Sequence, residues 1–218
     1  MKEVIEKQAG ISLKRNFIFP CCAKISRFQN VVVSSHPNII MLGYFGGLQS
    51  WQCVEQVIEI AIRLRKLDDR YKLLILTGSK VDKIQHLLDE LGKENYILKA
   101  VSQEEIPDWV GKMDISFALR SDRSLNRVSS PTKLRESLAA GVPIVVTEAS
   151  GDWDEVVSVE TGMVIPNLRI SEKTIADLHN FCLQVKANRI DFFDKCRNAV
   201  ANHTWEFYSE KFIKFIEK

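Results

Sequence analysis

The sequence predicts an α/β protein in which a parallel sheet carries helices on both faces. Three observations lead to this prediction. Short, nearly continuous apolar runs alternate with segments of helical apolar spacing, the connections between them are short, and 218 residues suffice to bury a large core. An apolar content of 45% and a formal net charge of +2 fit a globular domain and give no field that would recruit nucleic acid.

Strands are expected where apolar residues run without interruption between turn signals. Residues 38–45, NIIMLGYF, form such a run and are typical of a strand that is buried on both faces. Before Pro37, the run at residues 16–20 ends in a proline and predicts a brief additional strand. The remaining strands are expected at residues 71–77, 95–101, 114–119, 143–147 and 162–165.

Helices are expected where apolar side chains recur at intervals of three and four residues. Such spacing places one apolar face of each helix against the sheet. Glycines after two of these segments, Gly92 and Gly141, suit helix ends. The helices are expected at residues 51–67, 80–91, 104–112 and 131–140, and from 170 to the C-terminus with breaks near Asn188 and His203.

The segment SSPTKLRESLAAGVP, which begins at Ser129, is the most informative part of the chain. Ser130 is predicted to cap a helix, and Pro131 is predicted to occupy its first position, where a missing N–H is tolerated. Gly141 suits a left-handed stop. The first turn of such a helix presents free backbone N–H groups and the positive end of the dipole, which favours phosphate.

Two charged residues of this helix, Lys133 and Glu136, are three positions apart and therefore share a face. A cation beside a phosphate site and a carboxylate deeper in are suited to hold the diphosphate and the ribose hydroxyls of a nucleotide. The alternative interpretation is an ordinary capped helix on which Lys133 and Glu136 form a solvated pair. The helix sequence by itself leaves both interpretations open.

The loops that follow the predicted strands supply further candidates, because ligands of such sheets bind beyond the carboxyl ends of the strands. Gly46 and Gly47 follow the first strand, Ser102 lies on a plausible rim for a base after the third, and Arg120 ends the fourth. Arginine grips phosphate oxygens in pairs. The polar segment 121–130 is expected to be a mobile lid. The dinucleotide fingerprint G-x-G-x-x-G is missing.

Other residue types argue against several kinds of site. The four histidines are scattered and the five cysteines contain no C-x-x-C pair, so neither a metal site nor a catalytic triad is expected. The cysteines are read as reduced thiols, which indicates a cytoplasmic protein. No apolar run approaches the ~20 residues of a membrane span, and the N-terminal residues lack the apolar core of a signal peptide. The four tryptophans are expected to be packing residues.

The run SSPTKLRESLAAGVPIVVT resembles the donor-binding motif of the family-4 glycosyltransferases, whose two facing Rossmann-like domains form the GT-B fold. Three further stretches are similar, in order, to the interdomain segment, to the first strand with its glycine loop, and to the arginine-bearing strand before the motif. They are FIFPCCA from Phe17, IMLGYFGGL from Ile40 and DISFALR from Asp114.

The resemblance implies the Rossmann-like C-terminal half of a GT-B fold. Residues 1–36 are expected to be the interdomain linker with a remnant of the N-terminal domain, and residues 37–218 the donor-binding domain. The implied activity is hexosyl transfer from a nucleoside diphosphate sugar, with no metal or other cofactor, in bacterial surface polysaccharide biosynthesis. The expected place is the cytoplasm, with peripheral association of the full enzyme with the inner face of the membrane.

The resemblance also implies roles for single residues. Glu136 matches the later glutamate of the family's E-x7-E motif and would hold the ribose hydroxyls. Lys133 and the amides of Thr132 and Lys133 would face the diphosphate, and Arg120 would bind phosphate or sugar. The remaining expected substrate-binding positions are Ser130 at the helix start, Gly46 and Gly47 near the diphosphate, and Ser102.

The chain departs from the family pattern at several positions. Val128 stands where the earlier glutamate of E-x7-E is expected, and Gly47-Leu48 and Trp51-Gln52 stand where the family often has two cations. We hypothesise that Arg120 replaces this charge. The chain is expected to lack an acceptor-binding domain of about 150–200 further residues and to be inactive alone.

Two other functions remain open at the level of the sequence. One is a sugar-nucleotide epimerase of related build, which would need acid and base residues that face the sugar, and none stand out. The other is a non-catalytic α/β module in which the helix caps have only a structural role.

Overall fold

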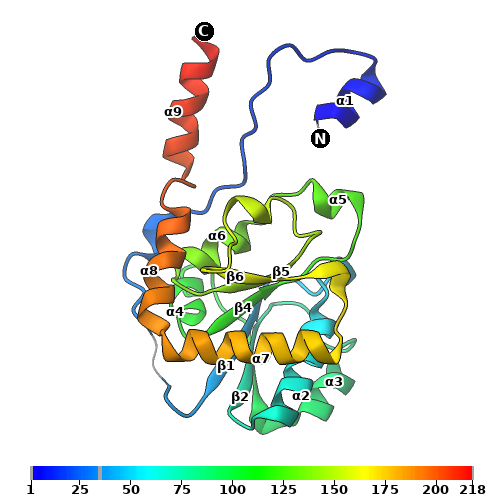
Figure 1. Cartoon of the computed structure of the whole chain (residues 1–218), viewed down its shortest axis with the longest axis vertical. Helices are drawn as coiled ribbons and strands as arrows, with labels where there is room; N and C mark the ends of the chain where they lie inside the picture. Colours follow the sequence, from blue (N-terminus) through cyan, green and yellow to red (C-terminus); the bar gives the residue numbers. More distant parts are fainter. Residues whose placement is uncertain (1, 34–35, 218) are drawn as a thin grey trace.

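The structure is a computed structural model that describes residues 2–33 and 36–217, with side chains from Ile5 onwards. Its centre is a six-stranded parallel sheet with the strand order β3-β2-β1-β4-β5-β6 (Figure 1). The predicted fold class is confirmed, and each predicted strand from residue 38 onwards is present. The strands are β1 (Ile40–Phe45), β2 (Tyr71–Leu76), β3 (Tyr96–Lys99), β4 (Ile115–Ala118), β5 (Ile144–Thr147) and β6 (Gly162–Ile165).

Helices cover both faces of this sheet. One face packs against α2 (Val54–Leu67), α3 (Gln85–Leu91) and α7 (Glu172–Ala187). The opposite face packs against α4 (Ile106–Val110), α6 (Thr132–Ala139) and α8 (Arg189–Val200), and Phe28 and Val31 from the N-terminal segment join this second core. The remaining helices are α1 (Lys2–Ala9), α5 (Ser124–Arg127) and α9 (Trp205–Ile216). The breaks that were predicted near Asn188 and His203 separate α7, α8 and α9.

A glycine in β1 allows the two layers to approach closely. A Cβ atom at Gly43 would overlap the side chain of Met113, which is fully buried in the second core. Because the space above Gly43 is occupied, the absence of a side chain there is a packing requirement of the sheet.

The edge of the sheet opposite the carboxyl ends is held by a buried ion pair. Asp114 accepts a hydrogen bond from the backbone N–H of Met41 at 2.8 Å, and Lys186 Nζ donates to its two oxygens at 3.0 and 3.1 Å. Arg189 donates to the carbonyl of Gly141 at 2.6 Å, where the predicted left-handed end of α6 is confirmed by a φ of +71°. These contacts join α6, α7 and α8 to the starts of β1 and β4.

The predicted strand at residues 16–20 is wrong. This segment has no strand partner among the described residues, and its apolar side chains instead pack on α9, which projects from the domain (Figure 1). Phe17 contacts Phe212 at a ring-centroid distance of 5.4 Å, and Phe19 stacks on Trp205 at 5.6 Å. An apolar run can bury its side chains against a helix as well as in a sheet, which its sequence does not distinguish.

The tryptophans were predicted to be packing residues, and Trp109 and Trp153 do pack against the second core. Trp51 and Trp205 are 41% and 47% exposed, and Trp109 and Trp153 are partly buried. Trp109 also packs against a cation, with the Nζ atom of Lys112 3.7 Å from its ring centroid. A large aromatic ring provides contact area at the surface as well as in a core.

Candidate functional site

The candidate site lies where the strand order reverses, between the neighbouring strands β1 and β4. The chain proceeds outwards from β1 to β2 and β3 on one side and from β4 to β5 and β6 on the other, so the loops after β1 and β4 diverge and leave a crevice. Gly46 and Gly47 follow β1 directly, Arg120 comes two residues after β4, and α6 begins at Thr132. The fold therefore brings these sequence-predicted residues to one place.

The centre of this crevice is the side-chain amide oxygen of Gln52. It accepts hydrogen bonds from Lys133 Nζ at 2.6 Å and from Arg120 Nη1 at 2.8 Å. The hydroxyl of Tyr44 shares its single proton between this oxygen, at 3.2 Å, and the carbonyl of Gly47, which is nearer. Gln52 Nε2 donates to Gln49 Oε1 at 2.9 Å. One neutral oxygen thus holds two cations and a phenol, which arrive from three different segments of the chain.

Both cations of this cluster are buried without a carboxylate partner. Lys133 and Arg120 are each 8% exposed, and among the described residues neither takes part in an ion pair. Burial lowers the pKa of Lys133 to about 7; the nearby Arg120 acts in the same direction, while Glu136 opposes it. Burial also lowers the pKa of Arg120. Two buried positive charges that share a single neutral acceptor would be strongly stabilised by a bound anion.

The loop after β1 passes directly over the Lys133 ammonium group. Gly46 has a φ of +125°, and a Cβ atom there would come within 3.0 Å of Lys133 Nζ. The ammonium also lies 4.7 Å from the ring centroid of Tyr44, close enough for a favourable cation–π contact. A side chain at position 46 would be strained and would crowd the cation, so the predicted close approach of Gly46 to the site is explained.

The start of α6 contributes two further donors. The backbone N–H groups of Thr132 and Lys133 have no acceptor among the described residues, whereas Leu134 N–H is bonded to the carbonyl of Pro131 at 3.2 Å. The cap of this helix is Pro131, without a side-chain cap. The prediction that Ser130 caps the helix is therefore wrong, and the two free amides are available to a ligand.

Ser130 does not cap the helix because its hydroxyl is engaged elsewhere. It donates to Asp152 Oδ2 at 2.7 Å and accepts from the backbone N–H of Cys21 at 3.0 Å. Asp152 also accepts from the guanidinium of Arg135, a fully buried residue of α6 that reaches Glu155 Oε2 at 3.2 Å. This network ties the entry of α6 to the loop after β5, and nothing in the sequence pattern had singled out Arg135.

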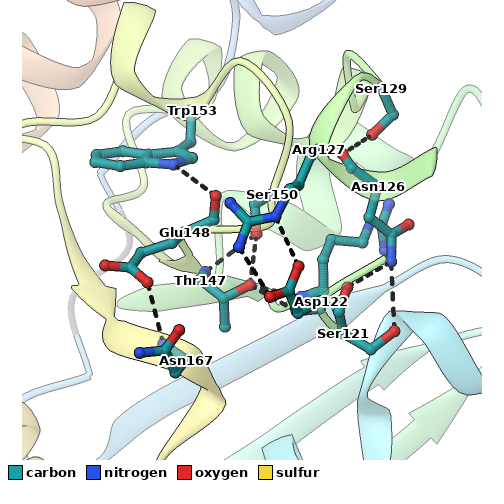
Figure 2. Close-up of polar contacts among 11 residues, drawn as sticks. Ser121, Asp122, Asn126, Arg127, Ser129, Thr147, Glu148, Ser150, Trp153 and Asn167 are labelled. Atoms are coloured by element: carbon teal, nitrogen blue, oxygen red, sulfur yellow. Dashed lines mark hydrogen bonds and ion pairs between the residues drawn. The ribbon is translucent and has the colours of Figure 1, made fainter. Parts of the chain in front are cut away.

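The position of Arg120 is fixed through its backbone. Thr147 Oγ1 accepts from the N–H of Arg120 at 3.0 Å and donates to its carbonyl at 2.8 Å. Ser150 Oγ lies 3.1 Å from Thr147 Oγ1 and donates to the end of β4 (Figure 2). Because the backbone N–H and C=O of Arg120 are both hydrogen-bonded to Thr147, the backbone from which its guanidinium reaches Gln52 is fixed in position.

The segment predicted as a lid contains several hydrogen bonds between its own residues. It contains α5, and Asn126 Nδ2 donates to the carbonyl of Ser121 at 2.8 Å. Asp122 and Arg127 form a paired carboxylate and guanidinium at 2.6 Å beside Thr147 (Figure 2). Asp122, Asn126, Arg127 and Ser129 of this segment thus form hydrogen bonds within it.

Glu136 lies on α6 one turn after Lys133 and is half-buried. Its carboxylate has no hydrogen bond or ion pair among the described residues, and burial raises its pKa, with Arg27 and then Lys133 opposing this effect. The alternative of a solvated pair is contradicted, because Lys133 is buried and the two side chains form no ion pair. A partly desolvated carboxylate with free acceptor oxygens is suited to bind hydroxyl groups.

Residues 39–180 match the sequence pattern of the family described as glycosyl transferases group 1. The chain belongs to this family. No curated protein matches the sequence.

Solved structures agree with the family in fold. S. aureus TarM, in a complex that contains UDP, superimposes with a TM-score of 0.72 and 18% identity over 100% of this chain and 42% of its own. WaaG, a glycosyltransferase involved in lipopolysaccharide biosynthesis, gives 0.64 and 17% over 95% and 48%. The C-terminal domain of LpcC from Francisella tularensis gives 0.60 and 18% over 84% and 94%.

These similarities confirm the predicted C-terminal half of a GT-B fold. The chain spans less than half the length of TarM and of WaaG, yet it covers nearly all of the isolated C-terminal domain of LpcC. In this family member, Gln52 occupies the region where the resemblance expects a cation, and the guanidinium of Arg120 reaches the same point from β4. The contact supports the hypothesis that Arg120 replaces the charge.

Ser102 lies apart from the cluster. It is exposed beyond β3, two strands away from β1, and its backbone N–H donates to Glu105 Oε2 at 2.9 Å. This contact closes the turn before α4, and a role at the rim of a base remains a prediction.

Sequence reasoning found part of the cluster and missed the rest. Trp51-Gln52 stood out in the sequence as a departure from the family pattern, and Gln52 is the residue that accepts hydrogen bonds from both cations. Tyr44 was missed, because it looks like one more apolar position of a buried strand.

Two kinds of site are not found in the described part of the chain. Within residues 2–33 and 36–217, no group of three or more His, Cys, Asp or Glu side chains is arranged to hold a metal ion. None of the helices described there combines the length and the apolar character that a membrane crossing requires.

Proposed function

We propose that this site binds the diphosphate of a nucleoside diphosphate sugar and that the chain is the donor-binding part of a glycosyltransferase. The observation that carries the proposal is the buried pair of Arg120 and Lys133, which share only a neutral acceptor. An anion that replaces this acceptor would satisfy both cations at once.

The chemistry of the donors favours a diphosphate over a smaller anion. Arg120 and Lys133 converge on one point and suit the oxygens of one phosphate, while the free amides of Thr132 and Lys133 suit the oxygens of a second. The unpartnered carboxylate of Glu136, one turn further along α6, would accept hydrogen bonds from the ribose hydroxyls.

The same donors would assist the transfer reaction. When the bond between the sugar and the diphosphate breaks, negative charge develops on the departing phosphate oxygens. Cations and helix amides that are already positioned there stabilise this charge without side-chain nucleophilic attack. The acceptor would be bound by a further domain, and the complete enzyme is proposed to build bacterial surface polysaccharide, in line with the involvement of the similar WaaG in lipopolysaccharide biosynthesis.

Titration calorimetry tests the proposal. Uridine and guanosine diphosphates are titrated into the wild-type chain and into Lys133→Ala and Glu136→Ala, with Lys66→Ala as the control, because Lys66 is an exposed lysine on α2. We expect the first two variants to bind at least about tenfold more weakly, which corresponds to the loss of one charge-assisted contact, while the control is unchanged. Wild-type affinity in both site variants would reject the assignment. Thermal shifts that are absent with every nucleotide would favour the non-catalytic module.

A further inference from the structure

The hydrogen bonding of Gln52 is unusual for an uncharged side chain. Its amide oxygen has two lone pairs but is approached by three donors, Lys133 Nζ, Arg120 Nη1 and the Tyr44 hydroxyl, at 2.6, 2.8 and 3.2 Å. Among the described residues, neither cationic group has another side-chain acceptor. The arrangement would suit an anionic oxygen better than an amide oxygen.

We infer that Gln52 is an internal substitute for the ligand, whose amide oxygen occupies the position of a phosphate oxygen in the free protein. The inference rests on the proposed function, since it concerns the same two cations. A diphosphate can contact Lys133 and Arg120 together only after Gln52 has turned out of the crevice. Gln52 therefore sets the affinity of the site and protects two buried charges when no ligand is bound.

The geometry explains why a ligand oxygen must compete with Gln52. Lys133 Nζ and Arg120 Nη1 both lie within 2.8 Å of one point, and that point is the amide oxygen. Lys133 is covered on its other sides by the rings of Tyr44 and Phe45, 4.7 and 5.9 Å from its Nζ, and by Gly46. An anion that binds both cations at this point must therefore displace the amide oxygen.

Gln52 is also placed where its side chain can leave without disturbing the core. It belongs to a three-residue 3-10 turn, Ser50–Gln52, outside β1 and α2, and its side chain is partly exposed. Its amide nitrogen is anchored only to the exposed Gln49. A rotation of this side chain breaks four hydrogen bonds of Gln52, and each cation regains its bond when an anion enters.

The test compares two opposite substitutions. Inorganic pyrophosphate and uridine diphosphate are titrated into the wild-type chain, Gln52→Ala and Gln52→Glu. The matched controls are Gln184→Ala and Gln184→Glu, because Gln184 is exposed on α7 and its side chain has no contact among the described residues. The melting temperature of each variant is measured without ligand.

We expect affinity and stability to change in opposite directions. Gln52→Ala removes the internal competitor, so it binds both probes about five- to tenfold more tightly, and it melts at a lower temperature because two buried cations lose their acceptor. Gln52→Glu pairs with both cations, so it binds at least about tenfold more weakly and melts at a higher temperature. Both controls bind and melt as the wild type does.

The outcomes separate this inference from the proposed function. If the wild type binds and Lys133→Ala does not, but Gln52→Ala binds no more tightly than the wild type, then Gln52 is not a competitor and the inference is overturned while the function stands. If the wild type and Gln52→Ala both fail to bind either probe, the proposed function itself fails. Should Gln52→Ala not fold, the weaker binding and higher melting temperature of Gln52→Glu decide the question, and unchanged values overturn the inference.

Discussion

The lowered pKa of Lys133 makes a quantitative prediction about ligand binding. Burial sets this pKa at about 7 in the free protein, whereas an unperturbed lysine titrates near 10.4. A bound diphosphate places negative charge beside the ammonium and raises its pKa again. Binding above pH 7 must therefore take up a proton, and the affinity must fall as the pH rises.

The magnitude follows from the pKa of the free protein. At pH 8 about 0.9 of the Lys133 side chains are neutral, so each binding event takes up about 0.9 proton. Between pH 7 and pH 9 the affinity then falls by up to about 50-fold, because each unit of pH above the free pKa reduces the charged fraction about tenfold. The groups that face Lys133 are Arg120, Glu136 and Tyr44, and burial raises the pKa of the Tyr44 hydroxyl so that it stays neutral in this range.

Calorimetry in several buffers measures the proton uptake directly. Uridine diphosphate is titrated at pH 8 in buffers of different ionisation enthalpy, and the slope of the observed enthalpy gives the number of protons. Working above pH 7 keeps the diphosphate itself fully ionised. The variant Lys133→Ala serves as the control, since it should bind weakly and with zero slope. A wild-type slope of zero, together with an affinity that is constant from pH 7 to pH 9, would refute the reasoning.

Three predictions concern stability and are measured by urea unfolding. The folded state lowers the pKa of Lys133, so the unfolded chain binds more protons above pH 7. The free energy of unfolding of the wild type should therefore rise by up to about 1.4 kcal/mol per pH unit from pH 7 to 9, and Lys133→Met should abolish this rise. A difference in unfolding free energy between the two proteins that does not change with pH would contradict the prediction. Gly43→Ala should destabilise the folded protein by about 1–3 kcal/mol, because the new Cβ atom overlaps Met113. Gly78→Ala is the control and should not destabilise it, since the space around Gly78 is open. Equal free energies of unfolding for the two variants would contradict the packing argument. Arg135→Ala should lower the free energy of unfolding by about 3–5 kcal/mol, because Asp152 and Glu155 lose their buried partner. A loss below about 1 kcal/mol would show that this network does not hold α6 in place.

Much of the fold was predictable because its signals are local. Six apolar runs became the six strands, and the interruptions near Asn188 and His203 became the ends of helices, since periodicity and helix stops act over a few residues. The location of the site was also predictable, because parallel strands bring the residues that follow them to one edge. Arg120, Gly46 and Lys133 were identified in this way.

The predictions from the sequence were wrong where a segment could form either a local contact or a contact with a distant part of the chain. Ser130 has the chemistry of a helix cap, but Asp152 and Cys21 offer it bonds that appear only when the loop after β5 and the N-terminal segment pack together. Residues 16–20 have the composition of a strand, but the aromatic face of α9 takes up their side chains. These are tertiary contacts between distant segments, and they override local preference.

The sequence by itself determined a parallel α/β domain with cations and helix amides at the carboxyl edge of its sheet. It could do so because the spacing of apolar residues that distinguishes strands from helices extends over only a few neighbouring residues. Only the tertiary structure decided that Lys133 is buried and that Gln52, 81 positions earlier, accepts hydrogen bonds from both Lys133 and Arg120. From the sequence, a lysine on a short helix is expected to be solvated, whereas in the folded chain the loop after β1 covers Lys133. Burial and hydrogen-bond partnership are properties of the packed chain, and they give this cluster its demand for an anion.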